Sequence, residues 1–485
     1  DSLTDGRNNL KQRIKTLRRL VAEEEAERQP NQDRISVWRD DIFSCVKELQ
    51  DIEQQIKTSY PGYENLLQKT YTAPLEQVQA CLQGDETMVE YAIGKGLGDE
   101  STSLFTFIIS EHDLDMIHTS VDSLFFKDIR TIENAFSSLG NSQPGLEKYH
   151  RITASLHQLY LTLIQPVEVR LNNNNLLIVP DGDLAKIPFE ALLSSPEGSK
   201  KRINFAALQY LLYKYRISYA YSASLLCRNR KNDEIPGHIY AFAPSYGSGT
   251  ENQTRAGLGN LEAIFQEIEG IGKWFSQCRF ISGQQASKRS FRSLSRDNAI
   301  IHLAMHAVVN KDNHNYSYLA FSEQDSVPHD SRLYNYEISL MDMKAPLVVL
   351  SACNTGDGAI IQGEGTMSLH RGFLLAGVPS VVHTLWSVED ASSAKIMDNF
   401  YKYLSEGKDK REALHLAKIE YINSMPPTLV NPYFWSGYAL SGDYAKIKQA
   451  GNYNVIYIIT VLTLLSLILI VSHYRRQSSL RRRFT

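Results

Sequence analysis

The sequence predicts an α/β protein in which helices cover a largely parallel sheet. A helical hairpin is expected before the sheet, and one transmembrane helix after it. Three observations support this prediction. Short apolar runs alternate with helical stretches from about residue 215 to 445, and such alternation is typical of parallel sheets. The first 60 residues are polar with helical spacing of apolar positions, and residues 455–472 are almost wholly apolar.

The composition is that of a folded protein long enough for two or three domains. The chain has 485 residues, of which 43% are hydrophobic and 22% charged, both ordinary values. A formal net charge of −3 gives no overall attraction to nucleic acid, so no nucleic-acid partner is expected. Because the first residue is Asp1, the sequence is interpreted as a fragment or a processed product.

Residues 1–62 are expected to form a helical hairpin. Apolar residues recur at helical spacing on both sides of Pro30, which separates the two helices. Two interpretations stay open for this hairpin. It is either an antiparallel pair that packs on the main domain, or the end of an upstream helical-repeat region, although no repeat of about 34 residues is visible.

Residues 63–235 are expected to form the first half of the main domain, at 63–445. Three strands in a meander, two helices and a buried strand at Leu176–Val179 are predicted there. The strands are residues 88–93, 104–110 and 115–120, and the helices are 121–138 and 146–163.

Residues 236–445 are expected to form the second half, with strands and helices in alternation. The predicted strands are 238–242, 279–282, 299–304, 347–350 and 380–385, after one at 217–221, and the predicted helices are 258–275, 365–376, 391–405 and 410–424.

Two buried strands in this half are each followed by a residue that can do chemistry. Cys353 follows the apolar run 347–350, and His306 follows the run 299–304. Ligands bind outside the carboxyl ends of such strands, and an imidazole can activate a thiol for nucleophilic attack. Backbone N–H groups at Ala307 and Cys353 would supply an oxyanion hole. A packing role for both side chains stays open at this point, since cysteine is often buried.

The other motifs exclude several kinds of site. The five cysteines contain no C-x-x-C pair, and His302 and His306 lie on a strand without the glutamate of a zinc protease, so no metal is predicted. Phosphate-binding glycine loops are absent, so no cofactor is predicted. His302 is interpreted as a buried, hydrogen-bonded histidine, and the four cysteines other than Cys353 as packing residues.

Residues 454–473 are predicted to form a transmembrane helix. The eighteen uncharged residues Val455–Ser472 would reach about 27 Å as a helix, close to the roughly 30 Å of a bilayer core. The tail at 474–485 holds five arginines, so the positive-inside rule places it in the cytoplasm and the large domain outside. A tail-anchored protein with its large domain in the cytoplasm is the alternative.

Several motifs, in this order, resemble those of the CHAT domain family. They are Val179–Leu192, Ile301–Ala307, Leu347–Gly356, Gly363–Leu369, Leu385–Asp390 and Asn431–Tyr438. CHAT domains are caspase-like cysteine peptidases, related to separase and more distantly to gingipains and legumain, and they often follow TPR repeats. The resemblance implies a caspase-like sheet, with a pseudo-peptidase half at about 63–235 and a catalytic half at about 236–445.

The resemblance also implies roles for individual residues. It places the family's catalytic histidine at His306 and its nucleophile at Cys353. Asp357 and Glu364 would receive a basic P1 side chain, as in separase-like relatives, and a solvated or loop-ordering role is the alternative for each. Ala307 stands where many relatives have glycine, which puts the oxyanion geometry in doubt. Caspase specificity for aspartate is not implied, because the Gln-Ala-Cys-x-Gly form is absent.

The resulting prediction is a membrane-anchored CHAT cysteine endopeptidase that cleaves a protein partner with a His306/Cys353 dyad. The expected partners are a protein or peptide substrate, a membrane bound through Val455–Ser472, and a regulatory protein bound through the N-terminal helical region. The alternative is a CHAT scaffold with an idle dyad, which acts in signalling through protein–protein contacts.

Overall fold

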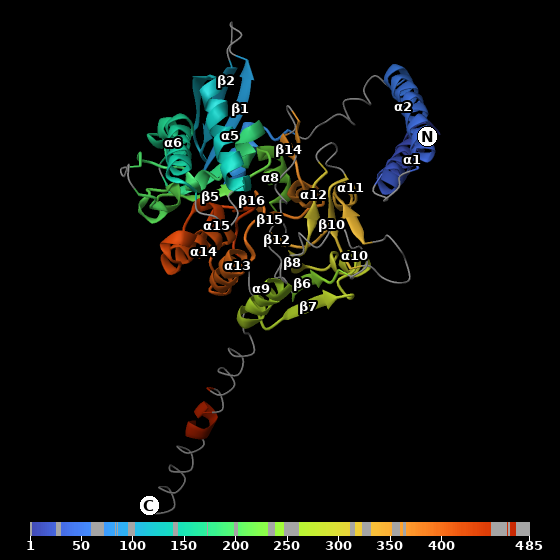
Figure 1. Ribbon diagram of the computed structural model, residues 1–485. Helices are drawn as coiled ribbons and strands as arrows, with labels where there is room; N and C mark the ends of the chain where they lie inside the picture. The colour runs from blue at the N-terminus through green and yellow to red at the C-terminus, as the bar shows by residue number, and fades with distance from the viewer. Residues whose placement is uncertain are drawn as a thin grey trace, which may run out of the picture. The chain divides into compact units, whose positions relative to one another are not determined.

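The structure is a computed structural model of the chain, and it divides into two compact units, Asp1–Val78 and Gln79–Thr485 (Figure 1). The structure describes residues 2–25, 31–59, 72–82, 84, 86–95, 102–138, 144–171, 173–197, 202–230, 238–246, 261–310, 316–322, 331–351, 359–361, 365–447, 463 and 466–471.

The first unit contains the expected helical hairpin. Helices α1 (Ser2–Glu25) and α2 (Gln32–Ser59) pack against each other. Ile14, Leu17 and Cys45 form their buried contact. Because these residues recur at helical spacing, each helix presents one apolar stripe to the other. Cys45 is therefore a packing residue, as predicted.

The second unit is built on an eleven-stranded sheet with the order β3-β2-β1-β4-β5-β16-β15-β12-β8-β6-β7. Neighbouring strands are parallel except in the pairs β1/β2, β2/β3 and β15/β16. The strands are β1 (Glu86–Lys95), β2 (Thr102–Ile109), β3 (Leu114–Val121), β4 (Asn175–Val179), β5 (Arg216–Tyr219), β6 (His238–Pro244), β7 (Cys278–Gly283), β8 (Ala299–Ala304), β12 (Val348–Ser351), β15 (Ser380–Thr384) and β16 (Tyr438–Gly442). The prediction of a largely parallel α/β sheet is confirmed.

Helices and short 3-10 turns join these strands. The α-helices are α4 (Leu75–Cys81), α5 (Ser123–Ser138), α6 (Leu146–Leu163), α7 (Gln165–Glu168), α8 (Ala223–Asn229), α9 (Leu261–Trp274), α10 (Lys288–Leu294), α11 (Asn335–Ile338), α12 (Leu369–Leu375), α13 (Asp390–Ser405), α14 (Lys410–Ser424) and α15 (Pro432–Trp435). The 3-10 turns are η1 (Gly182–Lys186), η2 (Phe189–Ala191), η3 (Phe205–Ala207), η4 (Leu211–Tyr213) and η6 (Pro427–Leu429). Two small sheets complete the fold, one of β9 (Ala307–Val308), β10 (Tyr318–Ala320) and β11 (Arg332–Tyr334), and one of β13 (Ala359–Ile361) and β14 (Gly365–Met367).

The central strands β8 and β12 are buried on both faces. On β8, Ile300 belongs to one apolar cluster and Ile301 to the other. On β12, Val349 belongs to the first cluster and Val348 to the second. Helices α9 and α13 contribute to the first cluster, and α10 and α12 to the second. Alternate residues of a strand point to opposite faces, so helices on both faces explain why these two strands are mostly apolar rather than alternating.

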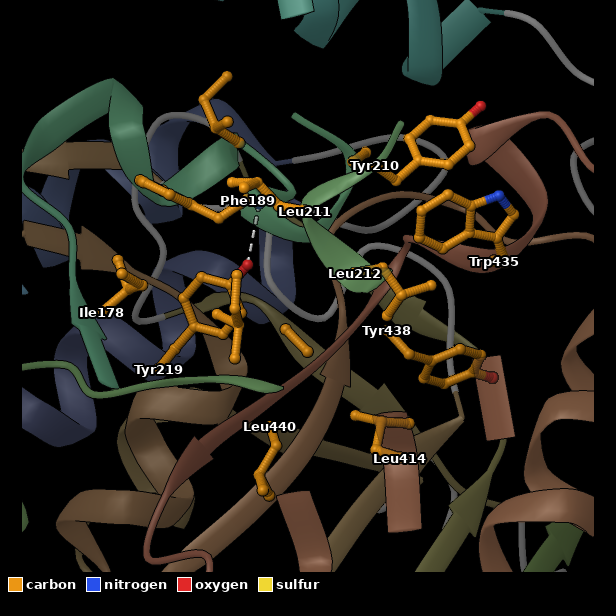
Figure 2. Packing of buried hydrophobic residues seen from close by; sticks show 14 of the residues in the cluster. Ile178, Phe189, Tyr210, Leu211, Leu212, Tyr219, Leu414, Trp435, Tyr438 and Leu440 are labelled. Atoms are coloured by element: carbon orange, nitrogen blue, oxygen red, sulfur yellow. Dashed lines mark hydrogen bonds between the residues drawn. The ribbon is translucent and has the colours of Figure 1, made fainter. Parts of the chain in front are cut away.

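Strand β16 joins the two parts of the large sheet, and the sequence analysis does not predict it. It lies between β15, to which it is antiparallel, and β5, to which it is parallel. Large side chains pack around it (Figure 2). The rings of Tyr210 and Trp435 meet edge to face with centroids 5.0 Å apart, and Trp435 precedes the strand by three residues.

One predicted helix is partly wrong. Residues 365–376 are not one helix, because Gly365–Met367 form β14, which pairs antiparallel with β13. Helix α12 begins only at Leu369, after Ser368 in an extended conformation. Three residues that pair with a neighbouring strand have their backbone hydrogen bonds satisfied there, so they do not join the helix that follows.

The prediction of a transmembrane helix is also wrong, and with it the single-pass membrane localisation. Within the described residues, no helix is both long and apolar enough to cross a bilayer. Of residues 454–473, the structure describes residue 463 and 466–471. The orientation inferred from the arginine-rich tail depended on this span and is withdrawn.

Candidate active site

His306 lies two residues beyond the end of β8. The strand is buried along its whole length between β6 and β12, to both of which it is parallel. His306 itself is half-buried. Since the carboxyl ends of parallel strands open onto one edge of a sheet, this position holds a side chain on a rigid support while leaving it accessible.

The main chain of His306 is held on both sides. Its N–H donates to the Tyr246 hydroxyl at 3.1 Å, and its carbonyl accepts a hydrogen bond from the N–H of Ala320 at 2.9 Å. The Tyr246 hydroxyl in turn donates to the carbonyl of Ala320 at 2.9 Å. The Tyr246 and His306 rings also lie 4.9 Å apart between centroids. These contacts fix the imidazole although it follows the end of a strand.

The surroundings of His306 favour its neutral form. Burial lowers the pKa of His306 below its ordinary value of 6.5, and the negative charge of Asp390 partly offsets that effect. The imidazole is therefore largely neutral at pH 7, and one of its two ring nitrogens is unprotonated and can accept a proton. A general base needs this state before it can act.

Asp390 is a site residue that the sequence analysis did not single out. It is the first residue of α13, after the N-cap residue Glu389, whose carboxylate accepts the N–H of Ser392 at 2.7 Å. Asp390 is accessible to solvent, yet partial desolvation raises its pKa, as do the charges of Glu389 and Glu267, while His306 lowers it. The signal in the sequence was its position at the end of the Leu385–Asp390 motif.

Strand β12 ends beside β8 in a parallel register that pairs Ser351 with Ala304. The Ser351 hydroxyl lies 3.1 Å from the Tyr438 hydroxyl and 3.3 Å from that of Ser393, and the latter two lie 2.5 Å apart. This network ties the end of β12 to β16 and to the first turn of α13. The same turn carries Asp390, so it contacts the end of β12 and acts through its charge on His306, which follows β8.

A buried polar group supports β8 from within. His302 is fully buried, with Nδ1 3.0 Å from the Tyr401 hydroxyl and Nε2 3.1 Å from Glu267 Oε1. Tyr401 lies on α13 and Glu267 on α9. The prediction that His302 is a buried, hydrogen-bonded histidine is confirmed. Its contacts link the strand that precedes His306 to both helices on that face.

The remaining predicted site residues are only partly covered by the structure. Cys353, Asp357 and Glu364 lie outside the described residues, so their roles stay predictions. Ala307 is half-buried in β9 and pairs with Leu319 of β10. Its role as an oxyanion donor also stays a prediction.

The family model of the CHAT domain matches residues 153–443 of this chain. Tetratricopeptide repeat protein 28 from Mus musculus is 23% identical over 389 residues, and the match covers 69% of this chain and 15% of the relative. The protein of the same name from Homo sapiens is 23% identical over 385 residues, with the same coverage of 69% and 15%. The chain thus spans about 15% of the length of these curated relatives.

Two solved structures show weaker likenesses. The separase–securin complex from Saccharomyces cerevisiae has a TM-score of 0.47 at 10% identity, covering 76% of this chain and 30% of that one. The complex of the RgpB pro- and mature domains from Porphyromonas gingivalis has a TM-score of 0.40 at 11% identity, covering 67% and 78%. The family-model match, by contrast, extends over more than half of the chain. This chain therefore belongs to the CHAT domain family.

Proposed function

We propose that this chain is a cysteine endopeptidase that uses Cys353 as nucleophile and His306 as general base and acid. The observation that carries the proposal is the parallel register of β8 and β12, in which Ala304 is paired with Ser351. Each proposed catalytic residue follows its paired position by two residues.

This register limits how far apart the two residues can lie. Two residues of extended chain span at most about 7 Å, and neighbouring strands lie about 4.8 Å apart. The chain therefore leaves β8 and β12 at the same edge of the sheet, two residues before His306 on one strand and two residues before Cys353 on the other. Close approach of a thiol and an imidazole is what nucleophilic cysteine catalysis requires.

The proposed reaction follows the usual course of acyl transfer to a thiol. His306 takes the proton of the Cys353 thiol while the sulfur attacks the scissile carbonyl carbon, and backbone N–H groups bind the resulting oxyanion. The C–N bond then breaks, and His306 gives its proton to the leaving amine. Water, deprotonated by His306, hydrolyses the thioester, which releases a carboxylate and restores the thiol.

Asp390 supports this cycle electrostatically. Its negative charge raises the pKa of His306, so it favours the imidazolium that forms when the thiol gives up its proton. Its carboxyl is accessible to solvent. We therefore add Asp390 to Asp357 and Glu364 as a candidate acceptor of a basic P1 side chain, and a protein or peptide with lysine or arginine at P1 is the proposed substrate class.

Regulation through the N-terminal helices is part of the proposal. The matched relatives are named for tetratricopeptide repeats, which are helix–turn–helix units of about 34 residues. Helices α1 and α2 also form a helical hairpin, although with 24 and 28 residues they are longer than the helices of one such repeat. We propose that a regulatory protein binds an array that this hairpin ends.

A peptide ketone that alkylates cysteine peptidases tests the function directly. We expect a probe with arginine at P1 to label Cys353, as mapped by mass spectrometry, and a probe with aspartate at P1 to label it more slowly. Labelling should be lost in Cys353→Ala, fall at least 100-fold in His306→Ala, and persist in the matched control Cys278→Ala.

A different outcome would favour the scaffold. If Cys353 is labelled no faster than the other four cysteines, and if His306→Ala leaves its rate unchanged, the dyad is idle. Protein–protein contact would then be the function left to this domain.

A further inference from the structure

Two cysteines outside the proposed active site lie in contact. Cys81 is the last residue of α4, and Cys227 lies on α8. Arg230, three residues after Cys227 at the end of α8, places its guanidinium 3.9 Å from the Cys81 sulfur. A hydrogen bond between the two thiols shifts the pKa of both, and both are partly accessible to solvent. From the sequence, each is interpreted as a packing residue, because it lies in amphipathic or apolar surroundings.

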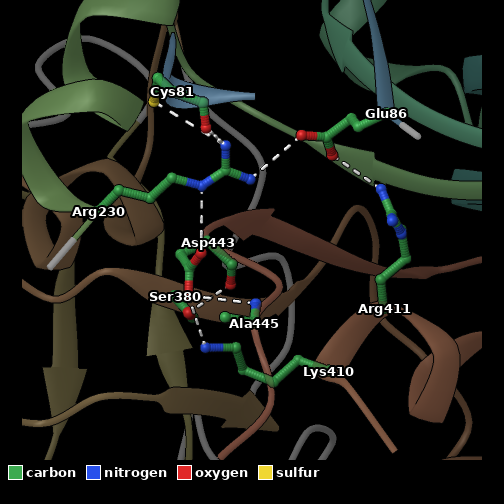
Figure 3. Close-up of polar contacts among 8 residues, drawn as sticks. All are labelled: Cys81, Glu86, Arg230, Ser380, Lys410, Arg411, Asp443 and Ala445. Carbon is green, nitrogen blue, oxygen red and sulfur yellow. Dashed lines mark hydrogen bonds and ion pairs between the residues drawn. The ribbon is translucent and has the colours of Figure 1, made fainter. Parts of the chain in front are cut away.

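A fixed guanidinium stands beside Cys81 (Figure 3). Arg230 Nη1 lies 3.9 Å from Cys81 Sγ and also donates to the Cys81 carbonyl oxygen. The same guanidinium donates to Glu86 and to Asp443, each at 3.2 Å. With its side chain only 9% exposed, the cation is held in place at the sulfur.

The charges of this cluster favour a thiolate at Cys81. Its described ion pairs join three cations, Arg230, Arg411 and Lys410, to two carboxylates, Glu86 and Asp443. All five side chains are at least nine-tenths buried. A negative charge on the neighbouring sulfur would balance the third cation. Unbalanced buried charge is costly, so this cluster stabilises a thiolate more than a thiol.

The two sulfurs have opposite tendencies to ionise. The hydrogen bond from Cys227, together with the charge of Arg230, lowers the pKa of Cys81 to about 7 against the opposing effect of burial. The hydrogen bond to Cys81 raises the pKa of Cys227. One sulfur is thus an attacking thiolate at neutral pH, and the other is a protonated partner beside it. Reactive dithiol pairs share this asymmetry.

We propose that Cys81 and Cys227 form a redox-modification site, which low-molecular-weight disulfides oxidise to an intramolecular disulfide. The Cys81 thiolate attacks one sulfur of the reagent, forms a mixed disulfide and releases one thiolate. Once Cys81 carries no charge, Cys227 loses its proton more readily and attacks the Cys81 sulfur, which releases the second thiolate. Two cysteine thiols are oxidised, the reagent disulfide is reduced to two thiols, and the two cysteine protons end on those thiols.

The disulfide should be easily reduced. The cluster stabilises the reduced, thiolate form, and a stabilised reduced form makes a disulfide more oxidising. The thiolate fraction of Cys81 at pH 7 is about 50-fold that of a thiol with the unperturbed pKa of 9.0. Because a thiolate of lower pKa is intrinsically less nucleophilic, each thiolate reacts about tenfold more slowly. The net exchange rate should therefore be roughly fivefold higher than for an unperturbed thiol.

The experiment treats the full chain with oxidised glutathione at pH 7 in a Cys353→Ala background, so that the proposed nucleophile does not contribute. After acid quenching and alkylation, peptide mass mapping should find Cys81 linked to Cys227, and dithiothreitol should reverse the link. In Cys227→Ser, glutathione should stay on Cys81 as a mixed disulfide. In Cys227→Ala, which also removes the hydrogen-bond donor, glutathione should reach Cys81 several-fold more slowly than in the serine variant.

Cys278 is the matched control, since it is also partly accessible and burial raises its pKa to about 12. Thermal melts of each variant establish that it is folded. The exchange rate of Cys81 can also be measured in the Cys353→Ala parent without any further substitution, so that measurement does not depend on the Cys227 variants. Exchange at Cys81 no faster than at Cys278 would overturn the proposal. A glutathione adduct that persists on Cys81 while Cys227 is intact would overturn it as well.

Discussion

A buried ion pair lies beside β16, where the two parts of the large sheet meet, and the effect of breaking it on the free energy of unfolding can be calculated. Lys418 on α14 donates to Glu190 Oε1 at 2.6 Å and to the carbonyl of Tyr438 at 2.6 Å. Glu190 also accepts from the Tyr219 hydroxyl at 3.0 Å. The side chains of Lys418 and Glu190 are only 1% and 5% exposed. Replacing the lysine by methionine keeps the aliphatic stem but leaves the buried carboxylate with one neutral partner.

We expect Lys418→Met to lower the free energy of unfolding by about 3–5 kcal/mol, the usual cost of an uncompensated buried charge. Glu190→Gln should cost a similar amount, since it leaves the ammonium unpaired. The double variant should lower the free energy of unfolding by at least about 2 kcal/mol less than the sum of the two single variants, because the two side chains interact with each other. Urea unfolding followed by tryptophan fluorescence measures all three, with the dependence on urea concentration checked for constancy.

The pair of Lys402 and Glu420 provides the matched control. It also involves α14, at 3.0 Å, but its side chains are 29% and 33% exposed. Lys402→Met should therefore cost no more than about 1 kcal/mol. Equal losses for Lys418→Met and Lys402→Met, or additive losses in the double variant, would refute the assignment of a buried, coupled pair.

Three further predictions concern the site, the backbone and pH. In Asp390→Asn the pKa of His306, followed by NMR of the imidazole, should fall below that of the parent, since the raising charge is gone; an unchanged or higher pKa contradicts this. Gly442→Ala should cost more than about 2 kcal/mol in urea unfolding, because φ is +97° and a Cβ would strike a backbone carbonyl, whereas Gly407→Ala, at φ +79° in open space, should cost about 1. Burial and neighbouring cations lower the pKa of His415 from 6.5 to about 4. The stability that the neutral imidazole contributes is therefore complete above pH 6.5 and is lost as the pH falls to 4. In His415→Gln, the decrease in the free energy of unfolding between pH 6.5 and pH 4 should be smaller by up to about 3 kcal/mol.

The sequence predicts best where a short stretch carries its own pattern. Strands β8 and β12 are buried on both faces and are mostly apolar, with His302 as the polar residue inside β8. Helices α6 and α14 begin and end at the predicted residues. Strand β16 was missed because Tyr-Ala-Leu-Ser-Gly is short and mixed in character. Its identity as a strand depends on pairing with β5 and β15, which lie far away in the sequence.

The same distinction explains the candidate site and the error at the C-terminus. His306 was predicted from its place after a strand, whereas Tyr246 and Asp390 reach it only through tertiary packing. The transmembrane prediction depended on the hydropathy of Val455–Ser472 alone, whereas the part of the chain that the structure describes has no helix long and apolar enough to cross a bilayer.

The first turn of α13 explains why the site depends on more than its two strand ends. Asp390 acts on His306 through its charge, and Ser393, three residues later in the same turn, contacts Ser351 at the end of β12. The N-terminal end of a helix carries a partial positive charge, which the carboxylates of Glu389 and Asp390 offset at the place where both strands end. A change in this turn should therefore alter the environment of His306 and the support of β12 together. A change at Ala307, which belongs to the separate β9–β10 ladder, should alter the surroundings of His306 and the predicted oxyanion donor while leaving the support of β12 unchanged.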